Sequence, residues 1–318
     1  RDGITQSVLA TFLECRAKAR WYLQGWSSKG TSLSMIYGEV SHGILEYAYE
    51  DVRLKKFKTL PSKDQVKKYL RIFEKNWLKE HKMPDKKTLE HLELSLLIAE
   101  ATLPVYFDFW HKDVKELPWL KLEAEFKIPY TIQVGDLGKK TAQTFLRGKM
   151  DGVFARKQEW LFETKTKGQI QENDLVDMLP FEHQVNFYLY CRRQLSQKVP
   201  AGVLYNIIRK IGLQQGKKEN IQQFANRCVQ DIRKRPEHYF IRMQVEITKN
   251  EMDAWAEELD DMIRDFYLWW TGQAGHYKNT GACINKYGRC NYLTACSSGR
   301  MSGYEKRKQV YRELGEDL

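Results

Sequence analysis

The sequence predicts an α/β protein, in which a sheet-forming segment at 118–248 lies between a helical N-terminal portion and a cysteine-bearing C-terminal portion. Up to about residue 117, apolar residues recur at three- and four-residue intervals, which is typical of amphipathic helices. From Pro118 onward apolar and polar residues alternate, which is typical of strands. With 42% hydrophobic residues in 318, the chain can bury a substantial core.

The expected elements follow this change of pattern. Helices are expected at 4–26, 33–52, 62–80 and 86–112, the third capped by Ser62 and the fourth following Pro84-Asp85. Strands are expected within WLKLEAEFKIPYTI (119–132), QTFLRGKMDGVF (143–154) and EWLFETK (159–165). Further elements are a helix at 175–194, a buried strand at 199–208, a helix at 217–233, a strand at 238–248 and a helix at 249–271. An irregular segment at 272–300 and a last helix at 303–314 end the chain.

We therefore divide the chain into three portions. Residues 1–117 form a helical portion that carries Cys15 and His42, residues 118–248 form the sheet core, and residues 249–318 form a helical portion with a cysteine cluster. We expect the three to fold as one integrated domain.

The charge balance favours a polyanionic partner. The chain has 52 basic and 41 acidic residues, a net charge of +11, with clusters such as RLKKFK, RKRPEH and EKRKQVYR. Any single cluster is more commonly a solvated helix face, so only their sum carries this inference. The sequence shows no long apolar run, no apolar leader and no phosphate-binding P-loop. We expect a cytoplasmic protein (the host cytosol, if a phage encodes it) that has no membrane partner and is not an ATP-driven motor.

Two acids and a lysine interrupt a strand pair that otherwise reads as buried. If the hairpin RGKMDGVFARKQEWLFETKTKG is symmetric about Lys157, Asp151 lies directly opposite Glu163. Lys165 shares the face of Glu163, because side chains two apart on a strand point the same way. This register is an assumption, and a slip of one residue would separate the three groups.

Such a pair of carboxylates has two interpretations. Two acids held together raise each other's pKa, and a hard divalent cation such as Mg²⁺ removes the repulsion. The bound metal would activate water and neutralise charge on a phosphate, and Lys165 would stabilise the developing charge. The alternative is an Asp–Lys–Glu salt-bridge network on an exposed sheet face, which is commoner for so short a pattern.

Three other residues indicate a functional site only when they are considered together with the acids. Gln184 and Tyr188, in EHQVNFYLY, share one face of the helix after the strand pair, where they could contact a phosphate or a base. His42 lies on an apolar helical stripe, where a lone histidine is usually a buried structural residue. It would become a metal ligand only if the fold brings it to the acids.

The cysteines predict a soft metal or a cluster. Cys283, Cys290 and Cys296 lie close together in CINKYGRCNYLTAC, and Cys15 is the natural fourth ligand. Disulfides are the weaker interpretation, since the sequence shows no secretion signal. Cys191 and Cys228 lie within expected helices and are more simply core thiols. Spacing alone does not choose between zinc and a [4Fe–4S] cluster, but either would join the two ends of the chain over the sheet.

Taken in order, these residues resemble the PD-(D/E)xK nucleases, in particular RecB-like and AddB-like exonucleases with an iron–sulfur cluster, of phage or CRISPR-associated type. The resemblance runs through Cys15, His42, Asp151 in GKMDG, Glu163 and Lys165 in ETK, Gln184, Tyr188 and the three C-terminal cysteines, and so spans nearly the whole chain. Those cysteines are more widely spaced than the C-x2-C-x5-C of some relatives.

The resemblance implies a restriction-endonuclease-like core, a central mixed sheet flanked by helices in the order αβββαβ. It implies Mg²⁺- or Mn²⁺-dependent DNA cleavage with the metal on His42, Asp151, Glu163 and the carbonyl of Thr164. It also implies catalytic roles for Asp151, Glu163 and Lys165, with Gln184 and Tyr188 shaping the site. The ligands of a [4Fe–4S] cluster would be Cys15, Cys283, Cys290 and Cys296, with zinc as the alternative.

The leading functional hypothesis is thus a metal-dependent DNA exonuclease acting on single strands or duplex ends, in recombination, repair or phage DNA processing. A recombinase or a single-strand-binding protein is the kind of protein partner this hypothesis allows. An endonuclease or flap nuclease of the same chemistry is a close alternative. From other classes come a non-catalytic DNA-binding subunit and a zinc-stapled scaffold protein.

Overall fold

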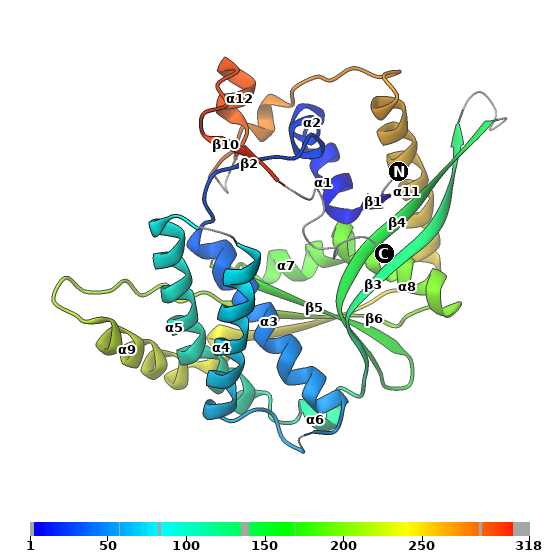
Figure 1. Ribbon diagram of the computed structural model, residues 1–318. Helices are drawn as coiled ribbons and strands as arrows, with labels where there is room; N and C mark the ends of the chain where they lie inside the picture. The colour runs from blue at the N-terminus through cyan, green and yellow to red at the C-terminus, as the bar shows by residue number, and fades with distance from the viewer. Residues whose placement is uncertain are drawn as a thin grey trace.

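The computed structural model describes residues 3–56, 58–81, 84–134, 140–168, 170–285 and 288–307 (Figure 1). At its centre is a six-stranded sheet with the order β1-β4-β5-β6-β7, in which β3 pairs along the other edge of β4. The strands are β1 (Ile4–Thr5), β3 (Trp119–Val134), β4 (Lys140–Ala155), β5 (Glu159–Lys167), β6 (Gly202–Arg209) and β7 (Phe240–Glu246).

The sheet is mixed, as the fold prediction required. Strands β3, β4 and β5 form an antiparallel meander, and β6 and β7 are also antiparallel. Strands β5 and β6 are parallel, so the chain must cross over between them. The crossover consists of α7 (Glu172–Met178), the 3₁₀ turn η2 (Leu179–Phe181) and α8 (His183–Ser196).

Helices cover both faces of this sheet. One face packs against the helices α3 (Leu33–Arg53), α4 (Lys63–Glu80), α5 (Lys86–Phe109), α6 (Asp113–Glu116), α9 (Ile221–Lys234) and α10 (Pro236–Tyr239). The other packs against α1 (Gln6–Glu14), α2 (Arg16–Leu23), α8 and α11 (Lys249–Trp270). Along β6, Leu204 and Ile208 enter the first core, while Val203, Tyr205 and Ile207 enter the second. This burial on both faces explains the continuous apolar run of β6.

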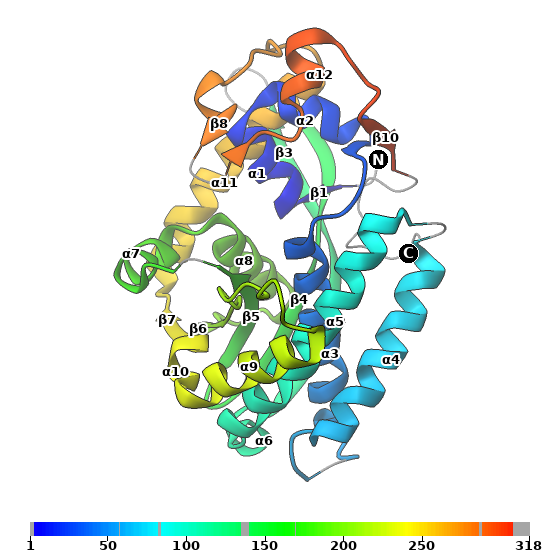
Figure 2. The same cartoon turned by 90° about the vertical axis from the view of Figure 1, so that its left-hand side faces the viewer.

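The N-terminal segment and the last described residues of the chain meet beside the sheet. Strand β10 (Tyr304–Lys306) pairs antiparallel with β2 (Trp26–Ser28). Helix α12 (Leu293–Ser298) lies beside α2 in both views (Figures 1 and 2). The 3₁₀ turn η3 (Thr280–Ala282) and the small hairpin of β8 (Ile284–Asn285) and β9 (Gly288–Arg289) complete this region.

Most of the expected elements are confirmed. Helix α4 begins after Ser62 with a capping box, in which the Ser62 side chain and Gln65 bond each other's backbone N–H groups. Helix α5 begins after Asp85, whose carboxylate accepts the N–H of Thr88.

Three expectations were wrong. The helix expected at 4–26 is broken at Cys15, whose backbone is extended; its first two residues form β1, and its last residue, Trp26, begins β2. The helix expected at 175–194 is interrupted by the turn containing Pro180, because proline disrupts a helix interior, and it restarts after Glu182. The helix expected at 303–314 is a strand at Tyr304–Lys306, and its residues from 308 lie outside the described part of the chain.

Within the described part of the chain, no helix is both long and apolar enough to span a membrane.

Candidate metal centre

The candidate site begins where β4 and β5 separate. Their pairing is symmetric about Lys157, as assumed, and its last recorded rung is Gly152 opposite Phe162. Beyond this rung, the N–H of Thr164, two residues after Phe162, donates to Oδ2 of Asp151 at 2.8 Å. The Asp151 carboxylate is thus fixed at the point where the two strands diverge.

His42 reaches the same carboxylate from the opposite layer. It lies in the middle of α3, with Nδ1 3.4 Å from Oδ2 of Asp151. The condition set by the sequence is met, because the fold brings this histidine to the acids.

Glu163 and Lys165 form the second half of the site. The Nζ of Lys165 donates to Oε1 of Glu163 and to Oε1 of Gln184, both at 2.6 Å. Gln184 lies in the first turn of α8, whose N-cap is Glu182. The lysine is therefore held between a strand and a helix that the chain reaches through its crossover.

Tyr188 lies one turn along α8 and packs against β4. A Cβ on Gly148 would come within 2.7 Å of the Phe126 ring and 3.2 Å of the Tyr188 ring. Glycine at this position therefore lets both aromatic rings lie across β4, close to Asp151.

The structure adds Glu123, which the sequence did not single out. Its place on β3 is opposite Asp151, between the recorded rungs at Leu122 and Ala124. Its carboxylate pairs with Nζ of Lys149. The Glu123 backbone has φ of +42°, a conformation that costs a non-glycine residue about 1–3 kcal/mol and is concentrated at functional sites.

Three side chains converge closely enough to hold one ion. One ligand atom each from His42, Glu123 and Asp151 lie within 4.8 Å of one another, the only such group of three in the described chain. Glu163 is not a member of this group, although the sequence predicted it as a ligand. A metal on the carbonyl of Thr164 stays a prediction.

A small cavity adjoins these groups. Its volume of about 10 Å³ is close to the minimum that one water needs. It is lined by His42, Leu45, Glu46, Tyr49, Leu122, Glu123, Asp151, Phe162 and Thr164. A nitrogen and several carboxylates thus border a space of ionic size.

The electrostatics of the site favour binding of a divalent cation. Burial and the Asp151 charge raise the pKa of Glu163 to about 7, and the same two causes raise that of Glu123 to about 6. Burial also opposes ionisation of Asp151, but His42 and Lys165 hold its pKa below the usual value. Asp151 in turn outweighs the effect of burial on His42 and raises its pKa. A divalent ion would relieve this carboxylate repulsion, and imidazole and carboxylate are donors that such ions accept.

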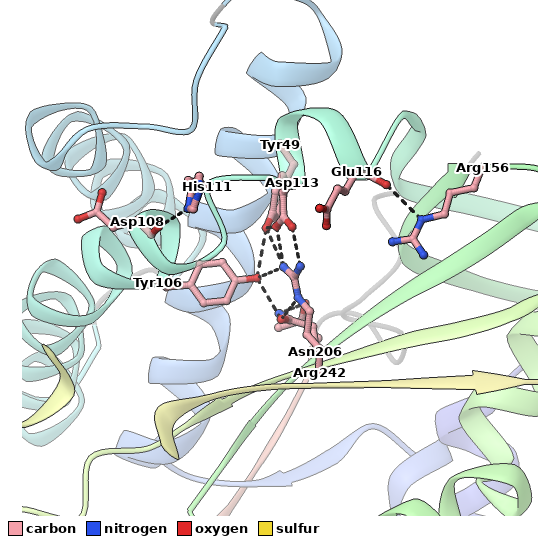
Figure 3. Close-up of polar contacts among 10 residues, drawn as sticks. Tyr49, Tyr106, Asp108, His111, Asp113, Glu116, Arg156, Asn206 and Arg242 are labelled. Atoms are coloured by element: carbon pink, nitrogen blue, oxygen red, sulfur yellow. Dashed lines mark hydrogen bonds and ion pairs between the residues drawn. The ribbon is translucent and has the colours of Figure 1, made fainter. Parts of the chain in front are cut away.

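A buried polar network supports the site from behind (Figure 3). Arg242 of β7 pairs with both oxygens of Asp113 of α6 at 2.6 Å. Asn206 of β6 accepts from Arg242 Nε at 3.0 Å and donates to Oγ1 of Thr164 at 3.3 Å. Tyr49 and Tyr106 complete the network, Tyr49 donating to Asp113 at 2.6 Å. The side chain of Thr164, next to the acids, is thereby tied to a buried ion pair.

The four predicted cluster cysteines lie in the region where the N-terminal segment and the last described residues meet. Cys15 and Cys296 share one small apolar cluster, and Cys290 packs with Cys296 in its neighbour. The N–H of Cys290 donates to the carbonyl of Cys283 at 2.9 Å. All six cysteines are free thiols, and the remaining two, Cys191 and Cys228, are buried within α8 and α9.

Two N–H groups point at the sulfurs. The backbone N–H of Asn279 donates to Sγ of Cys15 at 3.3 Å, and the indole N–H of Trp21 donates to Sγ of Cys296 at 3.2 Å. A tetrahedral zinc site would place its sulfurs about 3.8 Å apart, given Zn–S bonds of about 2.3 Å. No three described thiols lie within 4.8 Å of one another.

Comparisons with known proteins assign the chain to no family. No protein-family model matches the chain, and a search of curated proteins finds no match.

Proposed function

We propose that the chain is a metal-dependent deoxyribonuclease of the RecB-like PD-(D/E)xK type, acting as an exonuclease on DNA. The observation that carries the proposal is the convergence of His42, Glu123 and Asp151, from three separate elements, beside the paired Glu163 and Lys165. Recombination, repair or phage DNA processing is the setting that this activity fits.

The residues divide into two roles. His42, Asp151 and Glu123 hold the divalent ion, with Glu163 and the carbonyl of Thr164 as further ligands. When bound, Mg²⁺ or Mn²⁺ supplies Lewis acidity toward the phosphate and lowers the pKa of a coordinated water. Oε2 of Glu123 pairs with Lys149, and a carboxylate has a second oxygen that can bind the ion.

Lys165 provides the fixed positive charge. Its pKa is raised because the charges of Glu163 and Asp151 outweigh its burial, so it stays protonated at neutral pH. Held by Glu163 and Gln184, its ammonium lies beside the acids and stabilises charge that develops on the phosphate oxygens. Tyr188 forms the neighbouring wall.

The geometry favours an enzyme over a DNA-binding subunit. A binding module needs exposed cations, whereas here Lys165 pairs with the buried Glu163, and the neighbouring Glu123 has a strained backbone. Such groups cost folding free energy and recur where catalysis requires them.

Cleavage of end-labelled DNA tests the proposal. Linear and circular forms, single- and double-stranded, are incubated with Mg²⁺, with Mn²⁺ or with a chelator. We expect linear DNA to be degraded only with metal, and circles to be spared. Cut circles would make the protein an endonuclease of the same chemistry. Intact DNA under all conditions, with protein of full cluster content, would reject the nuclease proposal in favour of a binding subunit.

We also propose that Cys15, Cys283, Cys290 and Cys296 bind a [4Fe–4S] cluster. The cluster would join the α1–α2 segment to the C-terminal region and so hold the chain ends together. Its N–H donors would be Asn279 and Trp21, which already contact the sulfurs.

Anaerobically purified protein is expected to be brown, with broad absorbance near 400 nm and about four irons per chain. Cys15→Ser should lose most of this iron, whereas Cys191→Ser, within the α8 core, should retain it. Bound zinc with no iron would refute the cluster and support the zinc-stapled alternative.

A further inference from the structure

Basic residues gather at the carboxyl ends of β5 and β6. These two strands are parallel neighbours, so their carboxyl ends lie at the same edge of the sheet. Lys165 and Lys167 share one face of β5, and Lys167 is registered with Arg209 of β6. The next residue, Lys210, donates its backbone N–H to the carbonyl of Lys167 at 2.8 Å.

Lys167 is a half-buried cation without a carboxylate partner among the described residues. Its Nζ lies 5.4 Å from the centre of the Tyr205 ring. The acid that acts on it electrostatically is Glu182, but that carboxylate is engaged as the N-cap of α8, accepting the N–H groups of Gln184 and Val185. Burial, together with the charge of Lys165, lowers the Lys167 pKa. No described carboxylate thus forms an ion pair with Lys167, and the nearby Glu182 is held in place by the helix terminus.

Lys210 is a neighbouring cation. Its Nζ contacts Oγ of Ser34, at the start of α3, the helix that carries His42. Burial lowers its pKa, and no described carboxylate forms an ion pair with it. Lys210 therefore lies on the α3 side of the sheet, whereas Lys167 lies over Tyr205 on the opposite side, so only Lys167 continues the line from Lys165 along β5.

The spacing matches the repeat of a nucleic-acid strand. Residues two apart on a strand are separated by about 6.6 Å, on the order of the distance between successive phosphates of an extended strand. A strand with its reacting phosphate at Lys165 would present its neighbouring phosphate to Lys167.

We propose that Lys167 forms a phosphate subsite that binds the linkage next to the one being cleaved. The inference rests on the proposed nuclease function, which places the reacting phosphate beside Lys165. It adds a substrate-binding residue outside the metal centre, whose contribution is to fix the register of the strand.

Binding of a labelled oligothymidylate in chelator, titrated at several salt concentrations, tests the subsite without cleavage. Lys167→Met keeps the aliphatic stem and removes the charge. We expect about tenfold weaker binding at low salt, and a slope of log affinity against log salt that is smaller by about 0.7, the value for one lost phosphate contact on a single strand. Lys157→Met is the matched control, since this exposed lysine lies in the turn at the other end of β5 and should bind like wild type.

An unchanged slope and affinity for Lys167→Met would overturn the subsite, as would wild-type protein that binds no oligothymidylate. Thermal unfolding of each variant shows whether a loss reflects misfolding. The cleavage assay separates this inference from its premise. If binding depends on Lys167 but no metal-dependent cleavage occurs, the phosphate subsite is retained and the nuclease proposal is rejected. If the protein cleaves DNA but Lys167→Met binds as wild type does, the nuclease proposal is retained and the subsite is rejected.

A neutral linkage locates the subsite. A methylphosphonate placed at successive linkages should slow wild-type cleavage strongly at one linkage adjacent to the cut. The cleavage rate of Lys167→Met should not change with the same replacement, because this variant lacks the lysine charge that the phosphate at that linkage would contact. Equal sensitivity of the two proteins at every linkage would contradict the assignment.

Discussion

Asp151→Asn is expected to reduce metal-dependent cleavage by at least about 10³-fold while leaving the fold intact. Asp151 is the carboxylate on which His42, Glu123 and the N–H of Thr164 converge, so it is the ligand the metal can least replace. An asparagine oxygen still accepts the Thr164 N–H, which preserves the local structure. Loss of several kcal/mol of metal-dependent stabilisation corresponds to a rate loss of this size.

The same variant has a pH signature in metal-free protein. In the wild type, the folded-state pKa values of Glu163 and His42 are raised, so the folded protein holds protons that the unfolded chain releases. The stability that these groups contribute is present at low pH and is lost as the pH rises through their folded-state pKa values. For Glu163 that pKa is about 7. Asp151 contributes to both shifts. The melting temperature in chelator should therefore fall from pH 5 to 8 in wild type, and less steeply in Asp151→Asn.

Asp108→Asn is the matched control, because Asp108 is an exposed residue on α5. It should cleave and melt as wild type does. Full metal-dependent activity in Asp151→Asn would place the chemistry elsewhere in the molecule. An unchanged pH slope would show that Asp151 does not set the protonation of its neighbours.

The hairpin and the His42 helix could be predicted because their signals are local. The turn around Lys157 fixes which residues pair, and apolar periodicity defined α3 within one residue at each end. Apolar periodicity could not predict which residues of different elements lie close together in the fold. That His42 meets Asp151 depends on how α3 packs over the sheet, and the sequence could state it only as a condition.

Glu123 was missed because its sequence context is that of an ordinary solvent-facing strand residue. Lys121, Glu123 and Glu125 alternate with apolar neighbours, as on an exposed face. Its left-handed backbone, two residues beyond a register shift between Trp119 and Lys121, is a tertiary feature. No pattern of residue types in the chain signals that conformation.

The breaks in the expected helices have the same origin. Apolar spacing continues across Cys15, although the backbone there is extended. At the C-terminal end, pairing of Tyr304–Lys306 with Trp26–Ser28 overrides a helical pattern, because a contact across the whole chain outweighs local propensity. Pro180, by contrast, was a readable signal for the break between α7 and α8.

Asp113→Asn should lower the free energy of unfolding by about 3–5 kcal/mol. The Asp113 and Arg242 side chains are 1% and 9% exposed, and the substitution leaves the guanidinium buried without its counter-charge. The Arg242 side chain cannot rotate into solvent, since its guanidinium lies over the Trp110 ring at 3.9 Å and donates hydrogen bonds to Asn206 and Tyr106. Urea denaturation followed by circular dichroism measures the change.

Glu219→Gln is the comparison that isolates burial. The Glu219–Arg227 pair is also bridged twice, at 2.8 and 2.7 Å, but lies at the surface. Its loss should change stability little, because water and salt already screen it. Similar losses in both variants would mean that burial does not govern the Asp113 effect.

Removing both charges tests whether the cost arises from an unpaired ion. The double variant Asp113→Leu/Arg242→Met contains no buried charge, so it should be more stable than the sum of the single changes predicts, with a coupling of several kcal/mol. Its metal affinity should still fall below that of wild type, because Asn206 loses the Arg242 donor that helps to hold it against Thr164. Strict additivity of the two single changes would show that Asp113 and Arg242 do not act as a pair. Unchanged metal affinity would show that the network stabilises the sheet without orienting the site.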